Sequence, residues 1–251
     1  MLVSVITPVH NAGEHIEETI ESVLKQTFQD WEMILIDDKS TDSSLKIIEK
    51  YLAQDSRIRL IKNSKNQGAA VTRNNGIEAA QGRYIAFLDS DDLWLPTKLE
   101  KQLAFMKKHG YAFTYTAYEK LKDGQIIGVQ EVGERVNHND LLKTCSIGCL
   151  TVIYDTQKLG KMLMPIISRR QDFALWLKIL KEIPFAYGLN EVLSTYRLRS
   201  DSISGNKFKA AKYQWRVYRE FEHLNLFEAS YYFLQYSVFG VLKTYFHKEK
   251  K

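Results

Sequence analysis

Short runs of aliphatic, β-branched and aromatic residues alternate with amphipathic helical segments along the first 110 residues of the chain. The runs that predict strands are residues 2–7, 31–36, 58–61 and 84–88. Between the first two, Ile16, Ile20 and Val23 follow each other at intervals of four and three residues, which predicts a helix with one apolar face. Strict alternation of strands and helices is typical of an α/β fold with a mostly parallel central sheet flanked by helices. We therefore predict this fold class.

Polar residues directly follow three of these strands, at residues 7–11, 37–38 and 89–91. The carboxyl ends of parallel strands meet at one edge of a sheet, and ligands of open α/β sheets bind beyond that edge. Three polar clusters at the same edge therefore predict a binding site there.

The third cluster is acidic, since the apolar run 84–88 ends in Asp89, Ser90, Asp91 and Asp92. If the chain is still extended there, Asp89 and Asp91 point to the same side. Two carboxylates held close together repel each other, and a bound cation relieves the repulsion. Oxygen ligands alone favour Mg²⁺ or Mn²⁺ over zinc. The alternative is a solvated acidic turn that caps a helix beginning near Pro96.

Neither a G-x-G-x-x-G sequence nor a Walker-type loop follows the first strand, which disfavours a classical dinucleotide site. A nucleotide would instead be held by side chains and a metal. Asp38 can accept a hydrogen bond from a base N–H such as uracil N3. Arg73, near the start of the helix predicted over residues 69–80, can bond to a base carbonyl or a phosphate. The alternative for Arg73 is an ordinary surface arginine.

After residue 110 the alternation is less regular. We expect a strand over 111–118, a hairpin at Gly124, a strand over 150–154 and a helix over 173–181. Trp176 lies on the apolar face of that helix and is expected in the core. Asp172 lies at its first turn, where a carboxylate also favours the helix dipole, so a capping role is an alternative to a functional one.

The charge is unevenly distributed along the chain. Residues 206–251 contain nine Lys/Arg and four Glu, whereas residues 1–205 contain 26 residues of each sign. This balance argues against a general nucleic-acid surface and for one local electrostatic contact made by the tail.

Cys145 and Cys149 have no second pair with which to form a zinc site, and they indicate reduced thiols in the cytoplasm. We expect no signal peptide and no membrane span.

The tail, residues 206–251, contains thirteen of the 30 aromatic residues of the chain. Its apolar stretch 231–242 would be about 18 Å long as a helix, too short to cross a bilayer core. Tyrosines and lysines favour the headgroup region, so we expect a peripheral contact with the inner face of the membrane. The alternative is that these helices pack on the rest of the protein, or on a second subunit in a homo-oligomer.

Six segments of the chain resemble motifs of the family 2 glycosyltransferases, in the order and spacing of that family. They are VSVITPVHN, LIDDKSTD, NQGAAVTRNNGI, GRYIAFLDSDDLWLP, QDFALWLKIL and YRLRSDSIS, and they cover roughly residues 1–205. The resemblance implies a GT-A fold, which is Rossmann-like, with a nucleotide-sugar half (about 1–110) and an acceptor half (about 111–205). Residues 206–251 would follow as a helical tail.

The resemblance also implies roles for the polar residues of the first half. Pro8, His10 and Asn11 would lie in the loop that contacts the nucleoside, and Asp38 would bind the uracil. Arg73 would help to hold the nucleotide. The donor would then be a UDP-sugar.

The acidic cluster corresponds to the D-x-D of the family, with Asp89, Ser90 and Asp91 beside the diphosphate and Asp91 as the contact to Mn²⁺ or Mg²⁺. Asp172 would be the catalytic base, although Gln precedes it where most relatives have Glu. Arg199 stands where His is common, which favours a contact to phosphate over a contact to metal.

These roles imply an inverting transfer of a sugar from a UDP-sugar to a hydroxyl of a glycan or lipid-linked glycan, in the synthesis of bacterial surface polysaccharide. Two other functions compete with this one. A nucleotidyltransferase that makes nucleotide-sugars would normally have a glycine-rich loop after its first strand, and residues 7–11 contain no glycine. A non-catalytic nucleotide-sugar-binding module would not need a base such as Asp172.

Overall fold

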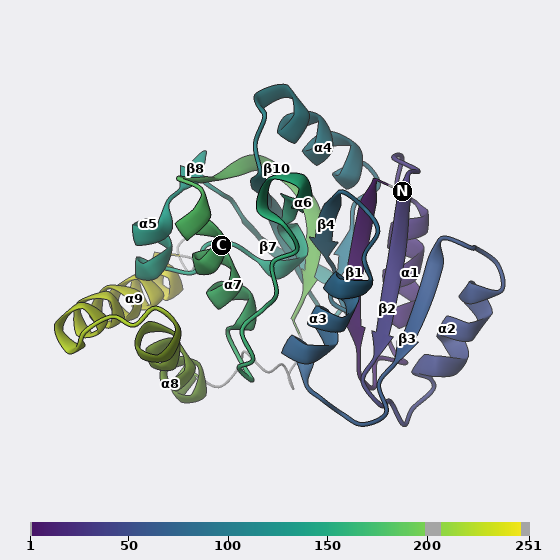
Figure 1. Cartoon of the computed structure of the whole chain (residues 1–251), viewed down its shortest axis with the longest axis horizontal. Helices are drawn as coiled ribbons and strands as arrows, with labels where there is room; N and C mark the ends of the chain where they lie inside the picture. The colour runs from purple at the N-terminus through teal and green to yellow at the C-terminus, as the bar shows by residue number, and fades with distance from the viewer. Residues whose placement is uncertain (1, 199–206, 247–251) are drawn as a thin grey trace.

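The computed structural model of the protein describes residues 2–198 and 207–246 and contains one mixed β-sheet (Figure 1). Its ten strands are β1 (Val3–Val9), β2 (Trp31–Asp37), β3 (Ile58–Lys62), β4 (Tyr84–Phe87), β5 (Leu93–Trp94), β6 (Phe113–Lys122), β7 (Gln125–Gln130), β8 (Arg135–Val136), β9 (Ile153–Asp155) and β10 (Ala186–Arg197). The spatial order is β3-β2-β1-β4-β9-β6-β10-β5, with β7 paired to β6 and β8 to β10.

The helices cover both faces of this sheet (Figure 1). They are α1 (Ile16–Leu24), α2 (Ser44–Leu52), α3 (Ala69–Ala79), α4 (Lys98–His109), α5 (His138–Lys143), α6 (Thr156–Leu159), α7 (Gln171–Glu182), α8 (Lys207–Arg216) and α9 (Leu226–Phe246). The short helices η1 (Cys149–Thr151) and η3 (Val217–Phe221) complete the set among the described residues.

The first half of the sheet is parallel, as the sequence predicts. β1 pairs in parallel with β2 and β4, and β2 with β3. All seven residues of β2 are buried, because its alternate side chains enter different cores. Met33 packs with the apolar face of α1, while Ile34 packs with Ile77 of α3 on the other face. The predicted α/β architecture is confirmed.

The first strand continues through Pro8 to Val9, so the predicted end at residue 7 is wrong. Alternate backbone groups of β1 face its two neighbours. The carbonyl of Ile6 bonds to Leu88 on the β4 side, and the carbonyl of Val9 bonds to Asp38 on the β2 side. Pro8 therefore faces the side on which β4 has already ended at Phe87. Its missing N–H removes no ladder hydrogen bond there.

The second half of the sheet is mixed. β9 lies antiparallel between β4 and β6, and β10 runs parallel to β6. The strand predicted over 150–154 is instead the short helix η1 followed by the three residues of β9. The hairpin at Gly124 is confirmed, with Asp123 and Gly124 both at positive φ, as a two-residue hairpin turn requires.

The tail is helical, as predicted. Its inner side chains pack on one another, with the rings of Trp215 and Phe233 5.6 Å apart and those of Tyr218 and Tyr232 6.4 Å apart. No helix within residues 2–198 or 207–246 is both long and apolar enough to cross a membrane.

Candidate active site

The acidic cluster forms a turn at the end of β4. The N–H of Asp92 donates to the carbonyl of Asp89 across 3.1 Å, so the chain is no longer extended at these residues. The premise that strand alternation aligns Asp89 and Asp91 is therefore wrong. The capping alternative is also wrong, because α4 begins only at Lys98, with Thr97 at its N-cap position.

Arg73 reaches this turn from α3 on the neighbouring segment. Its guanidinium forms an ion pair with Asp89, and the residue is 6% exposed, so the surface alternative is wrong. Burial acts to lower the pKa of Arg73, but the charges of Asp89, Cys149 and Asp172 outweigh it and raise the pKa. Nε and Nη1 of Arg73 are buried and have no hydrogen-bond partner within residues 2–198 and 207–246. A permanently charged group with two unused donors suits an anionic ligand.

Asp172 approaches the same cluster from the second half of the chain, on the first turn of α7. Its charge contributes to raising the pKa of both Arg73 and Cys149. The N-cap position of α7 is Arg170, with φ of 65°, and the described residues form no side-chain hydrogen bond with Asp172. Its carboxylate is therefore not used for capping. Trp176, further along α7, is fully buried, as predicted.

The predicted nucleoside residues lie together at the ends of β1 and β2. The His10 ring nitrogen Nδ1 donates to the carbonyl of Asp38 across 2.9 Å, and Asn11, at φ of 50°, accepts from the N–H of Thr41 across 2.8 Å. Pro8 lies two residues before His10 and is half-buried. Strand pairing brings these residues together, as the sequence analysis expects.

Asp38 is 3% exposed, and its carboxylate fixes the loop that leads into α3. It accepts hydrogen bonds from the Asn63 side chain at 2.9 Å and from the N–H groups of Gln67 and Gly68 at 2.8 Å. Burial acts to raise the pKa of Asp38, and these hydrogen bonds outweigh it and lower the pKa. The carboxylate therefore stays ionised.

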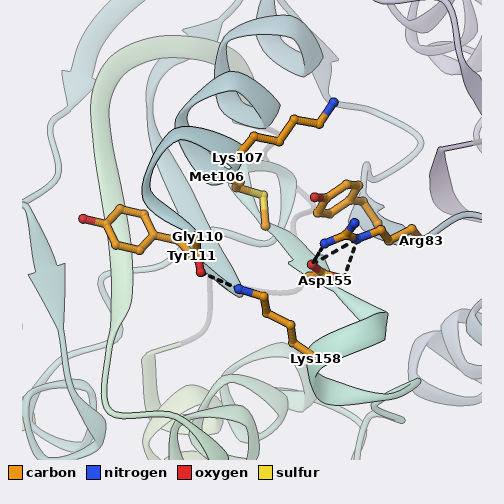
Figure 2. Close-up of a pocket in the computed structure, with 8 residues that line it drawn as sticks. Arg83, Met106, Lys107, Gly110, Tyr111, Asp155 and Lys158 are labelled. Atoms are coloured by element: carbon orange, nitrogen blue, oxygen red, sulfur yellow. Dashed lines mark hydrogen bonds and ion pairs between the residues drawn. The ribbon is translucent and has the colours of Figure 1, made fainter.

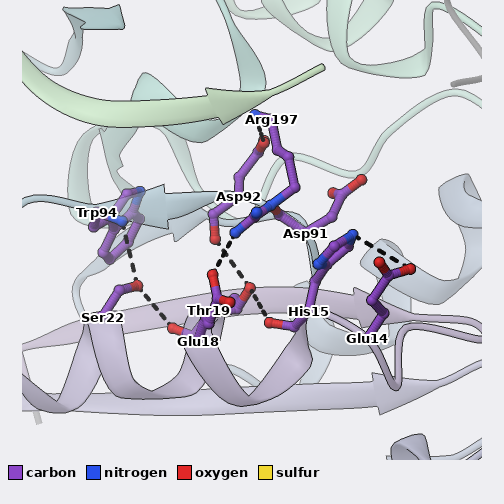
Figure 3. Close-up of polar contacts among 9 residues, drawn as sticks. All are labelled: Glu14, His15, Glu18, Thr19, Ser22, Asp91, Asp92, Trp94 and Arg197. Atoms are coloured by element: carbon purple, nitrogen blue, oxygen red, sulfur yellow. Dashed lines mark hydrogen bonds and ion pairs between the residues drawn. The ribbon is translucent and has the colours of Figure 1, made fainter. Parts of the chain in front are cut away.

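Arg197 is a site residue that sequence reasoning missed. From the end of β10 its Nε donates to the carbonyl of Asp91 across 2.9 Å, and its backbone N–H donates to Asp92 Oδ1 across 2.9 Å (Figure 3). The same guanidinium pairs with Glu18 of α1 across 2.5 Å. Arg197 therefore ties the acidic turn to two other elements.

Asp92 is the second missed residue. It is buried, and burial together with the charges of Asp91 and Asp89 raises its pKa well above the ordinary value. Its carbonyl accepts from the Thr19 hydroxyl across 3.0 Å (Figure 3). The sequence could have indicated both residues, since Asp92 adjoins the predicted pair Asp89 and Asp91, and Arg197 lies inside the motif YRLRSDSIS.

Of the predicted residues, Ser90 lies in the turn and Arg199 lies outside the described residues.

A cation at the acidic turn would have carboxylate oxygens as its protein ligands, which is the donor chemistry that Mn²⁺ and Mg²⁺ prefer. In the described part of the chain, no group of three or more His, Cys, Asp or Glu could hold a metal ion. Asp89 and Asp91 therefore fit only part of a coordination shell. A donor diphosphate could supply the rest.

A separate pocket of about 270 Å³ lies at the other end of β4 (Figure 2). Two of its cationic groups are already paired, because Arg83 Nη2 binds Asp155 across 2.6 Å and Lys158 Nζ binds the carbonyl of Gly110 across 2.5 Å. The pocket does not adjoin the strand ends that carry the predicted site residues.

Comparison with known proteins points to one family. The family model described as Glycosyl transferase family 2 matches residues 4–175. The Bacillus subtilis protein TuaG, named for teichuronic acid biosynthesis, is 49% identical over 96% of this chain and 97% of its own length. The Escherichia coli protein WfgD, named as a UDP-Glc:alpha-D-GlcNAc-diphosphoundecaprenol beta-1,3-glucosyltransferase, is 43% identical over 96% of this chain and 94% of its own length.

Solved structures share the fold at lower identity. Staphylococcus aureus TarS 1-349 in complex with UDP-GlcNAc superposes with a TM-score of 0.73 at 22% identity, over 93% of this chain and 70% of that one. A Pyrobaculum calidifontis mannosyltransferase in complex with GDP-Man and Mn²⁺ gives a TM-score of 0.70 at 15% identity, over 92% and 69%. The predicted GT-A fold is thereby confirmed.

Proposed function

Because the chain belongs to glycosyl transferase family 2, we propose that it transfers a sugar from a UDP-sugar to a hydroxyl of a glycan acceptor, in the synthesis of bacterial surface polysaccharide. The observation that carries the proposal is the buried ion pair of Arg73 with Asp89 at the end of β4, in which two guanidinium donors of Arg73 have no hydrogen-bond partner among the described residues. The printed names of TuaG and WfgD support the pathway and the donor class. We assign the catalytic domain to residues 1–205.

The donor nucleotide would bind across the ends of β1, β2 and β4. Pro8, His10 and Asn11 would face the nucleoside, and Asp38 would accept from the uracil N–H. The buried donors of Arg73 would bond to phosphate oxygens, where a charge-assisted hydrogen bond is strongest. Arg199 would add a second contact to phosphate.

Asp91 and Asp89 would hold Mn²⁺ or Mg²⁺ beside the diphosphate, with Ser90 between them in the turn. When bound, the cation would neutralise charge on the departing nucleoside diphosphate. Arg73 would contribute to the same end from the protein side, through the guanidinium donors Nε and Nη1 that its ion pair with Asp89 does not use.

Asp172 would act as the general base. Its carboxylate would take the proton from the acceptor hydroxyl while that oxygen attacks the anomeric carbon. The C–O bond to the acceptor would form as the bond to the UDP oxygen breaks. A single displacement of this kind inverts the anomeric configuration and needs no covalent nucleophile.

The acceptor we propose is a lipid-linked glycan, by analogy with the diphosphoundecaprenol acceptor in the printed name of WfgD. Such an acceptor would place the reaction at the cytoplasmic face of the membrane. Peripheral contact through residues 206–251 would agree with the absence of a spanning helix in the described residues.

The test is a panel of UDP-sugars, offered with Mn²⁺ and with lipid-linked or short-chain acceptors, with release of UDP as the readout. Acceptor-dependent UDP release is expected for one sugar of the panel. A nucleotidyltransferase would instead release pyrophosphate from a nucleoside triphosphate and a sugar phosphate. A binding module would show a thermal shift with UDP-sugar but no turnover, and either result would contradict the proposal.

A further inference from the structure

The helix α9 has one face packed against the protein. Ala229, Tyr232, Phe233 and Tyr236 follow each other at intervals of one to three residues, and their side chains are buried or half-buried. The α9 helix packs on α5, α8 and η3 through this inner face. These contacts fix the orientation of α9 on the rest of the fold.

The opposite face of α9 is apolar and exposed. Phe227, Tyr231, Leu234 and Val238 are spaced by four, three and four residues and are 87%, 54%, 63% and 47% exposed. Helical geometry places them about half a turn away from the inner face. We call these four residues the outer stripe. The sequence has no charged residue between Ala229 and Leu242, while Glu228 adjoins Phe227 at the start of the stripe.

The inner face of α9 reaches the segment that carries the proposed base. Arg170 Nη2 donates to the Tyr236 hydroxyl, and the guanidinium carbon lies 5.3 Å from the centroid of the Tyr236 ring. Arg170 occupies the N-cap position of α7, two residues before Asp172. One helix therefore carries an exposed apolar stripe on one side and supports the active-site segment on the other.

The net charge of the segment that contains the stripe favours one kind of partner. Residues 206–251 have a net charge of +5, while the rest of the chain is neutral. An anionic surface would be attracted to this tail, whereas the same tail on a second copy would carry the same excess positive charge. A groove of about 450 Å³ continues the stripe between α5 and α9, where Phe227 and Tyr231 form part of its wall with Leu142.

Resting on the proposed lipid-linked acceptor, we propose that the outer stripe of α9 docks on an anionic lipid surface. The contact between Tyr236 and Arg170 then holds the α7 N-terminus, and with it Asp172, next to that surface. Tyr236 is a positioning residue in this arrangement. A glycan carried on a membrane lipid would meet the base without leaving the interface.

The test of docking is flotation of the full chain with vesicles of phosphatidylcholine, with and without phosphatidylglycerol. The variant Phe227→Ser/Leu234→Ser/Val238→Ser removes most of the stripe. Its matched control is Ile126→Ser/Ile127→Ser/Val129→Ser, which removes three similarly exposed apolar side chains from β7. We expect the wild type to float with anionic vesicles, less so at high salt. The stripe variant should bind at least about tenfold more weakly, and the control should be unchanged.

Docking would be refuted if the wild type stays unbound at low salt, or if the stripe variant and its control lose vesicle binding equally. It would also be refuted if light scattering shows a wild-type dimer that becomes a monomer in the stripe variant. In that case a second copy of the chain would cover the stripe. Turnover on a water-soluble acceptor tests the proposed function independently of docking. With that acceptor, the stripe variant should release UDP at the same rate as the wild type. If no UDP is released by either protein, the proposed function fails while flotation still decides docking.

A second variant tests the positioning role of Tyr236. Tyr236→Phe keeps the ring and removes the hydroxyl that accepts from Arg170. We expect kcat on the soluble acceptor to fall several-fold, with donor affinity and flotation unchanged. An unchanged kcat would refute the positioning role of Tyr236.

Discussion

Lys98 is fully buried at the first residue of α4. Its ammonium donates to Gln102 Oε1 across 2.6 Å and lies 4.8 Å from the centroid of the Trp94 ring, with no carboxylate among these partners. Burial lowers the pKa of Lys98 to about 7. Lys98→Met keeps the length of the side chain and removes the titrating group, so the variant isolates the effect of this proton.

The sign and size of the effect follow from the two pKa values. The unfolded lysine titrates near 10.5 and the folded one near 7, so between these values the unfolded chain binds more protons than the folded protein. The stability contributed by Lys98 therefore rises with pH in this window, by at most about 1.4 kcal/mol per pH unit. Between about pH 6 and pH 9, the free energy of unfolding of the wild type should rise by about 2–3 kcal/mol relative to that of Lys98→Met.

The assay is urea unfolding, followed by circular dichroism at several pH values, for the wild type, Lys98→Met and a control. Lys107→Met is the matched control, because Lys107 lies exposed on the same helix. Taking the difference between wild type and variant cancels the other titrating groups, including the buried thiol of Cys149, whose pKa is raised by burial. If the wild-type and Lys98→Met curves run parallel between about pH 6 and pH 9, the ammonium is solvated in the folded protein and the reasoning is wrong.

Three further predictions concern the active site. Asp91→Ala should abolish transfer while circular dichroism shows an intact fold, and EDTA should abolish wild-type turnover; full activity in EDTA would contradict the metal assignment. Asp172→Asn should lower kcat about 10²- to 10⁴-fold with donor affinity retained, whereas near-normal turnover would show that the carboxylate is not the base. Arg197→Gln should weaken the apparent affinity for Mn²⁺ about tenfold or more, because it releases the acidic turn. The control Glu18→Gln removes only the partly exposed partner of Arg197 and should have a much smaller effect. Equal effects of the two variants would assign the role to the ion pair instead.

The first half of the fold was predictable because its signals are local. Each strand from β1 to β4 is a short apolar run followed by a polar cluster, and the parallel order places those clusters at one edge without any knowledge of side-chain contacts. β10 was missed for the opposite reason. Its residues Gly188, Asn190 and Glu191 interrupt the apolar pattern, and its pairing with β6 shifts register twice along its length. Only contacts distant in sequence make this segment a strand.

The motifs predict which residues belong to the candidate site, but they do not predict how those residues pair with one another. The residues Asp38, Arg73, Asp89 and Asp172 follow from the motifs, yet nothing in the order of residues indicates that Arg73 is buried or that Asp89 pairs with it. The helix α3 has mostly small and polar residues, so its sequence does not reveal which side faces the protein. The pKa of Arg73 depends also on Cys149 of η1 and Asp172 of α7, which lie about 80 to 100 residues later in the chain.

The pairing of β5 has a consequence for how the enzyme is made. Leu93 and Trp94 pair with Thr195 and Ser194 of β10, about 100 residues further along the chain. During synthesis the acidic turn leaves the ribosome long before this partner does, and it cannot be held by Arg197 until β10 has joined the sheet. A nascent or truncated chain that ends before β10 would therefore have most of the donor half but an unanchored acidic turn. Transfer activity should accordingly appear late in folding, at the step that inserts β10 between β6 and β5.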